Sequence, residues 1–167
     1  MYIEVTNCKD DKLVKYIKKA LEFYGEKLMT KSMLKNISVE IRFDHALKEM
    51  GGVTIEGYNK AKKARSFLIE VHTNLGVKSI LHTLAHEMVH IKQFARGEIT
   101  DKLNTWHGKY VNWHKVDYYD LPWEIEAYGK EQGLFNKFVT KEKLWEIVDN
   151  IGIPDRPPDK EKMGWKK

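Results

Sequence analysis

The sequence predicts an α+β fold, because it combines helical periodicity with short stretches in which apolar and polar residues alternate. Apolar side chains recur at intervals of three and four residues over 13–28 and 80–91, as on one face of an amphipathic helix. Four segments alternate with a period of two, as half-buried strands do: 2–6, 37–43, 53–58 and 67–72. We therefore expect a small sheet that packs on an N-terminal helix and on a central helix.

The chain has 167 residues, which is an ordinary length for one globular domain. Its 42% hydrophobic residues are enough for a core, and its 32% charged residues are typical of a solvated surface. We expect this domain to span 1–150 and an extended tail to follow over 151–167, which holds three of the four prolines. The single cysteine, Cys8, excludes a cysteine-rich zinc module, so a metal site must use histidine and carboxylate ligands.

Hydropathy and charge indicate which cellular locations and partners the sequence supports. No apolar run approaches the roughly 18 residues that a membrane span needs, and the N-terminus lacks a basic segment followed by an apolar one. We therefore expect a cytoplasmic protein without a membrane partner. The net charge of +5 is modest, and the densest basic stretch, 60–65, is typical of a turn between strands. Nucleic acid is thus a weakly supported partner, and the sequence does not indicate an oligomeric state.

The first half of the chain is expected to build the sheet. Asn7 or Asp10 can cap the N-terminal helix after the first strand. The short connections between the next three strands favour an antiparallel meander, with a mixed sheet as the alternative, and Gly51 and Gly52 are expected in a turn. Because the strand at 67–72 leads directly to the central helix, we expect it to wall a substrate cleft and to offer an exposed edge to an extended peptide.

The central helix, expected over 74–96 and ended by Gly97, carries the pattern His-Glu-x-x-His at 86–90. Residues four apart share a helix face, so His86 and His90 can place two imidazole nitrogens on one metal ion. Glu87 lies beside that pair, where a general base can take a proton from a metal-activated water. His82 is one turn earlier and is expected to pack or to support a ligand, because three histidines of one straight helix do not converge on a tetrahedral ion.

The third metal ligand must come from elsewhere, because a catalytic zinc takes three protein ligands and keeps one position for water. Residues 98–119 break the helical pattern and predict a loop or an irregular hairpin. A second helix is expected from Asp120 onward, with Pro122 in its first turn. We expect helix again over 133–149, with a break near Thr140.

The set His-Glu-x-x-His at 86–90 and Glu-x-x-Ala at 124–127 resembles the gluzincin group of zinc metallopeptidases, including small ImmA/IrrE-like enzymes. The resemblance implies a zincin-like fold, a bound Zn²⁺ and Glu124 as the third ligand, with Glu126 as the alternative. The family often has Asp or Asn where this chain has Tyr128. The contact that would orient a histidine ligand therefore departs from the family pattern.

His107 is the rival third ligand. Trp106, His107 and Gly108 resemble the His-Gly segment of SprT-like proteases, which act on protein–DNA crosslinks. That family has an aromatic residue four positions after the histidine, where this chain has Val111, and often a four-cysteine ribbon, which Cys8 alone cannot provide. The segment 80–132 also looks like small metallopeptidase-like proteins of bacteriophage genomes, which suggests a virus-encoded protein of the host cytoplasm or the virion.

The sequence thus predicts a zinc metallopeptidase that cleaves a peptide or protein substrate, with Glu87 as general base and His86, His90 and Glu124 on zinc. Four residues are candidate donors to the oxyanion: Tyr118, Tyr119, His107 and His114. Two other functions stay open. One is a zinc-binding module without catalysis, such as a virion component or an adaptor, and the other is an SprT-like, DNA-associated protease.

Overall fold

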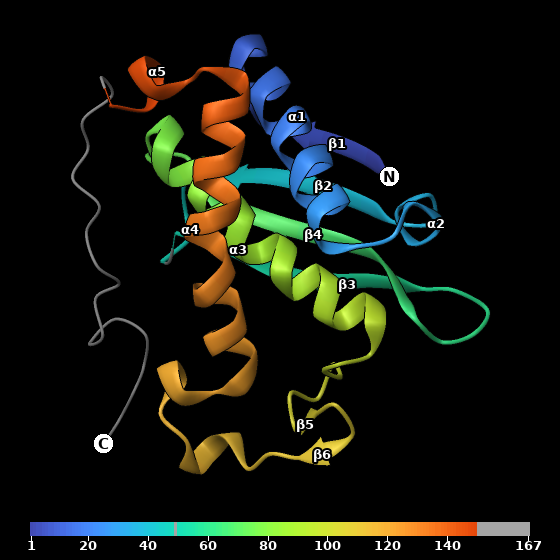
Figure 1. The fold of residues 1–167 in the computed structure, drawn as a ribbon. Helices are drawn as coiled ribbons and strands as arrows, with labels where there is room; N and C mark the ends of the chain where they lie inside the picture. Colours follow the sequence, from blue (N-terminus) through green and yellow to red (C-terminus); the bar gives the residue numbers. More distant parts are fainter. Residues whose placement is uncertain (49, 150–167) are drawn as a thin grey trace.

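The computed structural model describes residues 1–48 and 50–149, so the tail predicted over 151–167 lies outside the described residues. The fold is α+β with a small mixed sheet, as Figure 1 shows. The strands are β1 (Tyr2–Thr6), β2 (Ser38–Asp44), β3 (Gly51–Tyr58), β4 (Ala64–His72), β5 (Thr105–Trp106) and β6 (Lys109–Tyr110). The α-helices are α1 (Asp11–Leu28), α2 (Lys31–Leu34), α3 (Val77–Arg96), α4 (Pro122–Glu142) and α5 (Trp145–Asp149).

The four-stranded sheet has the order β1-β2-β4-β3. Strand β2 is parallel to both β1 and β4, whereas β3 is antiparallel to β4. The expected antiparallel meander is therefore wrong, and the mixed alternative is right. The physical reason is that β3 does not pair with β2: β4 lies between them, antiparallel to β3 and therefore parallel to β2, while the helix α1 lets β1 and β2 run parallel.

The edge strands of the four-stranded sheet are β1 and β3, and β4 is not one of them. The expectation that 67–72 offers an edge is wrong, because β4 is paired on both sides. Gly51 and Gly52 belong to β3 rather than to a turn. A Cβ atom on Gly51 would lie 2.8 Å from Thr83 Cγ2 and 2.8 Å from the Glu70 carbonyl oxygen, so only glycine lets β3 start this close to α3. The edge strand thus passes directly beside the central helix.

The main core lies between the sheet and the helices. Figure 1 shows α1 and α3 over one face of the sheet, with α4 crossing α3. The alternation of β2 and β4 directs Ile41 and Ile69 into this core, where both are fully buried. Buried Tyr24 of α1 donates a hydrogen bond to the Leu81 carbonyl oxygen over 3.1 Å, which ties α1 to the first turns of α3.

A second, smaller core holds the chain between α3 and α4. Its buried residues are Ile99, Leu121 and Trp123, and the half-buried Trp106 and Tyr118 pack against them. The aromatic residues that lack periodicity in 98–119 therefore anchor an irregular segment with the short β5–β6 hairpin, as expected. This second core sets the position at which α4 begins.

The ends of the helices follow local chemistry. Asp10 caps α1 by accepting from the backbone N–H groups of Lys12 and Leu13, and Gly97 ends α3 with φ 71°. Pro122 opens α4, and Lys143 ends it three residues after the expected break at Thr140. None of the helices among the described residues has the length and apolar character of a membrane span.

Candidate metal centre

Three side chains from two helices converge between α3 and α4. His86 and His90 lie four residues apart on α3, and Glu124 lies in the first turn of α4. The two histidine Nε2 atoms are 3.0 Å apart, and Glu124 Oε2 lies 3.3 Å from His86 Nε2 and 3.5 Å from His90 Nε2. All three residues are buried, and together they form a group that could hold a metal ion.

The outer nitrogen of each imidazole faces a hydrogen-bond acceptor. His86 Nδ1 lies 2.6 Å from Glu131 Oε2, and His90 Nδ1 lies 2.8 Å from Gln93 Oε1. Carboxylate and amide oxygens only accept, so each Nδ1 must carry the hydrogen of its hydrogen bond. In a neutral ring, the Nε2 atom then presents its lone pair to the centre of the site.

With both Nε2 atoms unprotonated, Glu124 Oε2 is a buried oxygen without a hydrogen-bond partner among the described residues. A buried polar atom left in this way costs about 1–3 kcal/mol. Two nitrogen lone pairs and a carboxylate oxygen that face one another at 3.0–3.5 Å also repel. The site therefore needs positive charge at its centre, either as protons on the Nε2 atoms or as a cation.

Without a metal, protons meet this need. Burial lowers the pKa of His86, but hydrogen bonds to Glu124 and Glu131 outweigh burial and raise it to about 10. The pKa of His90 is likewise raised, because the hydrogen bond to Glu124 overcomes the effect of burial. Burial alone would raise the pKa of Glu124, but its hydrogen bonds with the two histidines lower it to about 2. The group thus strongly favours positive charge at its centre.

The spacing of the three atoms also suits a small tetrahedral ion. Ligand atoms held about 2.0–2.2 Å from a tetrahedral zinc ion lie about 3.3–3.6 Å from one another. The observed separations of 3.3 and 3.5 Å fall in that range, and the 3.0 Å between the two Nε2 atoms is slightly shorter. The residues present therefore fit a metal ion without rearrangement of the two helices.

Glu87 lies next to His86 on α3 and is buried. Burial raises the pKa of its carboxyl group above the ordinary value, while the neighbouring histidines oppose the shift. A carboxylate with a raised pKa holds a proton more readily, which is what a general base needs when it works near neutral pH.

Glu126 and His107, the other candidate ligands, are not part of the metal-binding group. The carboxylate of Glu126 accepts from Lys92 Nζ over 2.7 and 2.8 Å. Burial raises the pKa of Glu126, but the hydrogen bonds from Lys92 and Gln93 outweigh it and lower the pKa. His107 is exposed at the turn between β5 and β6, where its ring packs against Trp106.

Aromatic side chains surround the site on the side of α4. Tyr118 hydrogen-bonds Glu124, and its pKa is raised by burial and by that neighbouring carboxylate. The Tyr128 ring lies edge-on to His86 with centroids 4.8 Å apart, and the Tyr119 ring lies 5.5 Å from that of Tyr128. His114 is exposed and stacks on the neighbouring tryptophan. Among the four expected oxyanion donors, Tyr118 lies close enough to Glu124, a member of the metal-binding group, for that carboxylate to raise its pKa.

Two residues that orient the histidines were not predicted. The sequence left the contact to a histidine in doubt, because Tyr128 stands where the resembling family often has Asp or Asn; Glu131 supplies that contact from one helical turn further along α4. Gln93 supplies the contact to His90 from one turn further along α3. The available signal was spacing, because Glu131 lies seven residues after Glu124 and Gln93 three after His90, both on the same helix face as the ligand.

Comparison with known proteins finds no matching family model, no matching curated protein and no matching solved structure. The resemblances drawn from the two sequence motifs therefore remain predictions. Function must be inferred from the chemistry of His86, Glu87, His90 and Glu124 themselves.

Proposed function

We propose that this protein is a zinc-dependent metallopeptidase with His86, His90 and Glu124 as the zinc ligands. The observation that carries the proposal is the convergence of three buried ligand atoms beside a buried glutamate. One of them, Glu124 Oε2, has no hydrogen-bond partner among the described residues while both Nε2 atoms are unprotonated. Three protein ligands leave the fourth position of a tetrahedral ion for a reactant, as catalytic zinc sites require.

The donor set favours zinc over harder cations. Two imidazole nitrogens and one carboxylate oxygen are a ligand set found in catalytic zinc sites, whereas magnesium and calcium prefer ligands that are all oxygen. When bound, zinc polarises the carbonyl group of a peptide bond and lowers the pKa of a coordinated water. Proton transfer and hydrogen bonding to the substrate are the work of the protein's own side chains.

Glu87 is the proposed general base. Its carboxylate takes a proton from water as the water oxygen bonds to the carbonyl carbon of the substrate. The protonated Glu87 then gives that proton to the amide nitrogen as the C–N bond breaks, which yields a carboxylate and an amine. The raised pKa of Glu87 supports both transfers, because a group that is too acidic cannot hold the proton between them.

Tyr118 is the proposed donor to the oxyanion. Its raised pKa keeps the hydroxyl protonated at any pH at which the protein is folded, so it can donate. The second core holds its ring beside the start of α4, next to Glu124. A donor fixed in this way needs little reorganisation as negative charge develops on the substrate oxygen.

A peptide substrate is supported by the edge strand. Strand β3 pairs with β4 on one side and has no strand on the other within the described residues. Its first residue, Gly51, packs against Thr83, one helical turn before Glu87. An extended peptide that adds to β3 would therefore run past the metal-binding group.

The test is the Glu87→Gln variant with zinc content and peptide hydrolysis measured together. We expect zinc to stay bound and hydrolysis of a mixed peptide library to fall by about 10²–10⁴-fold, the usual contribution of a general base. Glu22→Gln makes the same change at an exposed position of α1 and should alter neither. Retained hydrolysis in Glu87→Gln contradicts the assignment of the base.

Measurements of zinc binding and of peptide cleavage, with and without DNA, separate the rival functions. Wild-type protein that binds zinc but cleaves no peptide in the library indicates the non-catalytic binding module. Cleavage that requires DNA, is lost in His107→Ala and survives Glu124→Gln indicates the DNA-associated protease. The second outcome is not expected, because His107 is exposed and outside the metal-binding group.

A further inference from the structure

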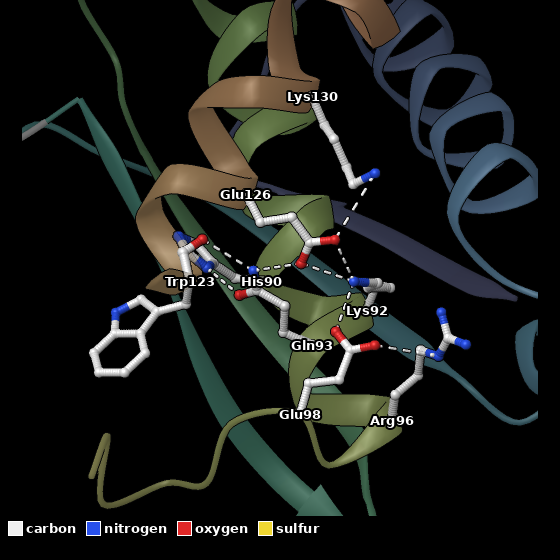
Figure 2. A network of polar contacts seen from close by, with 8 residues as sticks. All are labelled: His90, Lys92, Gln93, Arg96, Glu98, Trp123, Glu126 and Lys130. Carbon is white, nitrogen blue, oxygen red and sulfur yellow. Dashed lines mark hydrogen bonds and ion pairs between the residues drawn. The ribbon is translucent and has the colours of Figure 1, made fainter. Parts of the chain in front are cut away.

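A second polar cluster lies between α3 and α4, directly behind His90. Figure 2 shows its members: Lys92, Gln93, Arg96, Glu98, Glu126 and Lys130. Lys92 is 5% exposed and Gln93 is fully buried, so these groups must satisfy one another. The cluster reaches the metal-binding group through one contact, the hydrogen bond between Gln93 and His90.

Gln93 can adopt one amide orientation in this setting. Its Nε2 donates to the Trp123 carbonyl oxygen over 2.9 Å and to Glu126 Oε2 over 3.0 Å, which uses both of its hydrogens. A flipped amide would set its oxygen against those two oxygens and its NH₂ group against His90. The acceptors on Trp123 and Glu126 therefore force Gln93 Oε1 towards His90 Nδ1.

The orientation of Gln93 decides the state of His90. An amide oxygen at His90 Nδ1 requires hydrogen on that nitrogen, which leaves the Nε2 lone pair to face Glu124. The other arm of the amide binds the carbonyl of Trp123, the residue just before Glu124. One buried amide thus orients one ligand and fixes the backbone beside another.

Lys92 holds Glu126 in the position that Gln93 needs. Its ammonium group contacts both Glu126 oxygens, over 2.7 and 2.8 Å, and Glu98 Oε2 over 2.6 Å. The positive charge lets the carboxylate of Glu126 stay ionised between the helices. Glu98 also binds Lys92, but Figure 2 shows it on the side of Lys92 away from His90, and Gln93 makes its contacts to Trp123, Glu126 and His90.

We propose that Lys92, Glu126 and Gln93 form a relay that holds His90 in its metal-binding tautomer, so that Gln93 and Glu126 are positioning residues of the metal centre. This inference rests on the proposed zinc site and adds to it a set of residues that never touch the ion. Loss of the partner of a ligating histidine usually weakens metal binding by about 10–100-fold.

The test compares zinc affinity in four proteins by competition with a chelator. We expect Gln93→Met and Glu126→Leu to weaken zinc binding by about 10–100-fold relative to wild type. Glu98→Leu is the matched control, because it also takes one carboxylate from Lys92 but leaves Gln93 with both of its acceptors. It should bind zinc within about threefold of wild type.

A second readout separates positioning from general loosening of the fold. In the zinc-loaded wild type and in Glu98→Leu, the His90 Hδ1 proton should give a slowly exchanging NMR signal, and in Gln93→Met that signal should be lost. If Gln93→Met does not fold, the contrast between Glu126→Leu and Glu98→Leu decides the matter.

Zinc affinity in Gln93→Met and Glu126→Leu equal to wild type overturns the relay and leaves the zinc site standing. A wild-type protein that binds no zinc overturns both.

Discussion

Two polar clusters between the same pair of helices are built alike and differ in one respect. In one, His90 of α3 faces Glu124 of α4; two residues further along each helix, Lys92 faces Glu126. The second cluster contains its own cation, the Lys92 ammonium group, within 2.8 Å of three carboxylate oxygens. The first has two imidazole groups in place of that ammonium group, and with both Nε2 atoms unprotonated Glu124 Oε2 has no hydrogen-bond partner within the described part of the chain.

We interpret the Glu126 cluster as structural and, in line with the proposed function, the Glu124 cluster as a metal-binding site. A buried carboxylate that meets a lysine is neutralised when the chain folds, whereas one that meets two imidazoles is neutralised when protons or a metal ion arrive. The Glu126 cluster should therefore contribute to folding in every condition. The Glu124 cluster should contribute in a way that depends on zinc and on pH.

The largest expected effect is on stability, from removal of the internal cation. Lys92→Met leaves the buried Glu98 and the half-buried Glu126 without their common partner, which should cost about 3–5 kcal/mol of unfolding free energy. Urea denaturation of the variant and the wild type measures this loss of unfolding free energy. Lys130→Met is the control, because Lys130 is exposed and 3.8 Å from Glu126, and should change stability by less than about 0.5 kcal/mol. Equal costs in the two variants would contradict the structural role of Lys92.

The next effect is stabilisation of the folded protein by zinc. Free zinc at a hundredfold excess over its dissociation constant should add about 2.7 kcal/mol to the unfolding free energy, provided that the unfolded chain does not bind it. His86→Ala should lose this gain, and magnesium should not produce it in the wild type, because a nitrogen-rich site suits it poorly. If zinc does not change the melting temperature of the wild type, the cluster of His86, His90 and Glu124 is not a zinc site.

A smaller effect is expected where Glu131 orients His86. Glu131→Leu removes the carboxylate that lies 2.6 Å from His86 Nδ1, and zinc affinity should fall by about 10–100-fold. Tyr128→Phe keeps the ring that contacts His86 and should leave zinc affinity near that of wild type. If Tyr128→Phe weakens zinc binding and Glu131→Leu does not, Tyr128 rather than Glu131 orients His86.

The most gradual effect is the pH dependence of the zinc-free protein. The pKa of His86 rises from 6.5 to about 10 on folding, so its protonation stabilises the folded state fully below pH 6.5. That stabilisation should be lost as pH rises towards 10, while zinc affinity should rise over the same range because zinc displaces the proton. Denaturation of the zinc-free protein at several pH values measures the first trend; a stability that grows over this range would contradict it.

The sequence could predict the features that depend on residue spacing along one helix and on residue type. The arrangement of His86, Glu87 and His90 follows from positions on one helix, and the caps at Asp10 and Gly97 follow from residue types. Strand order could not be predicted in this way, because the alternation of β2, β3 and β4 is the same in a meander and in the observed order.

Whether Glu124 or Glu126 faces the two histidines is also decided by how α4 packs against α3. Both lie near the start of α4, and their order along the chain does not say which one faces the histidines. The structure separates them because α4 packs with Glu126 over Lys92 and Glu124 over His86 and His90. Glu131 was missed for the same reason, since its contact with His86 forms only when the two helices meet. Gln93 contacts His90 within α3, but Trp123 and Glu126 of α4 orient its amide, so its role also depends on that packing.

The central claim is that Glu124 completes a zinc site with His86 and His90, and zinc titration of wild type, Glu124→Gln and His107→Ala tests it most directly. We predict one equivalent of tightly bound zinc in wild type and in His107→Ala, and none in Glu124→Gln, whose amide lacks the charge that the site requires. Tight zinc binding by Glu124→Gln, or its loss in His107→Ala, would contradict the claim.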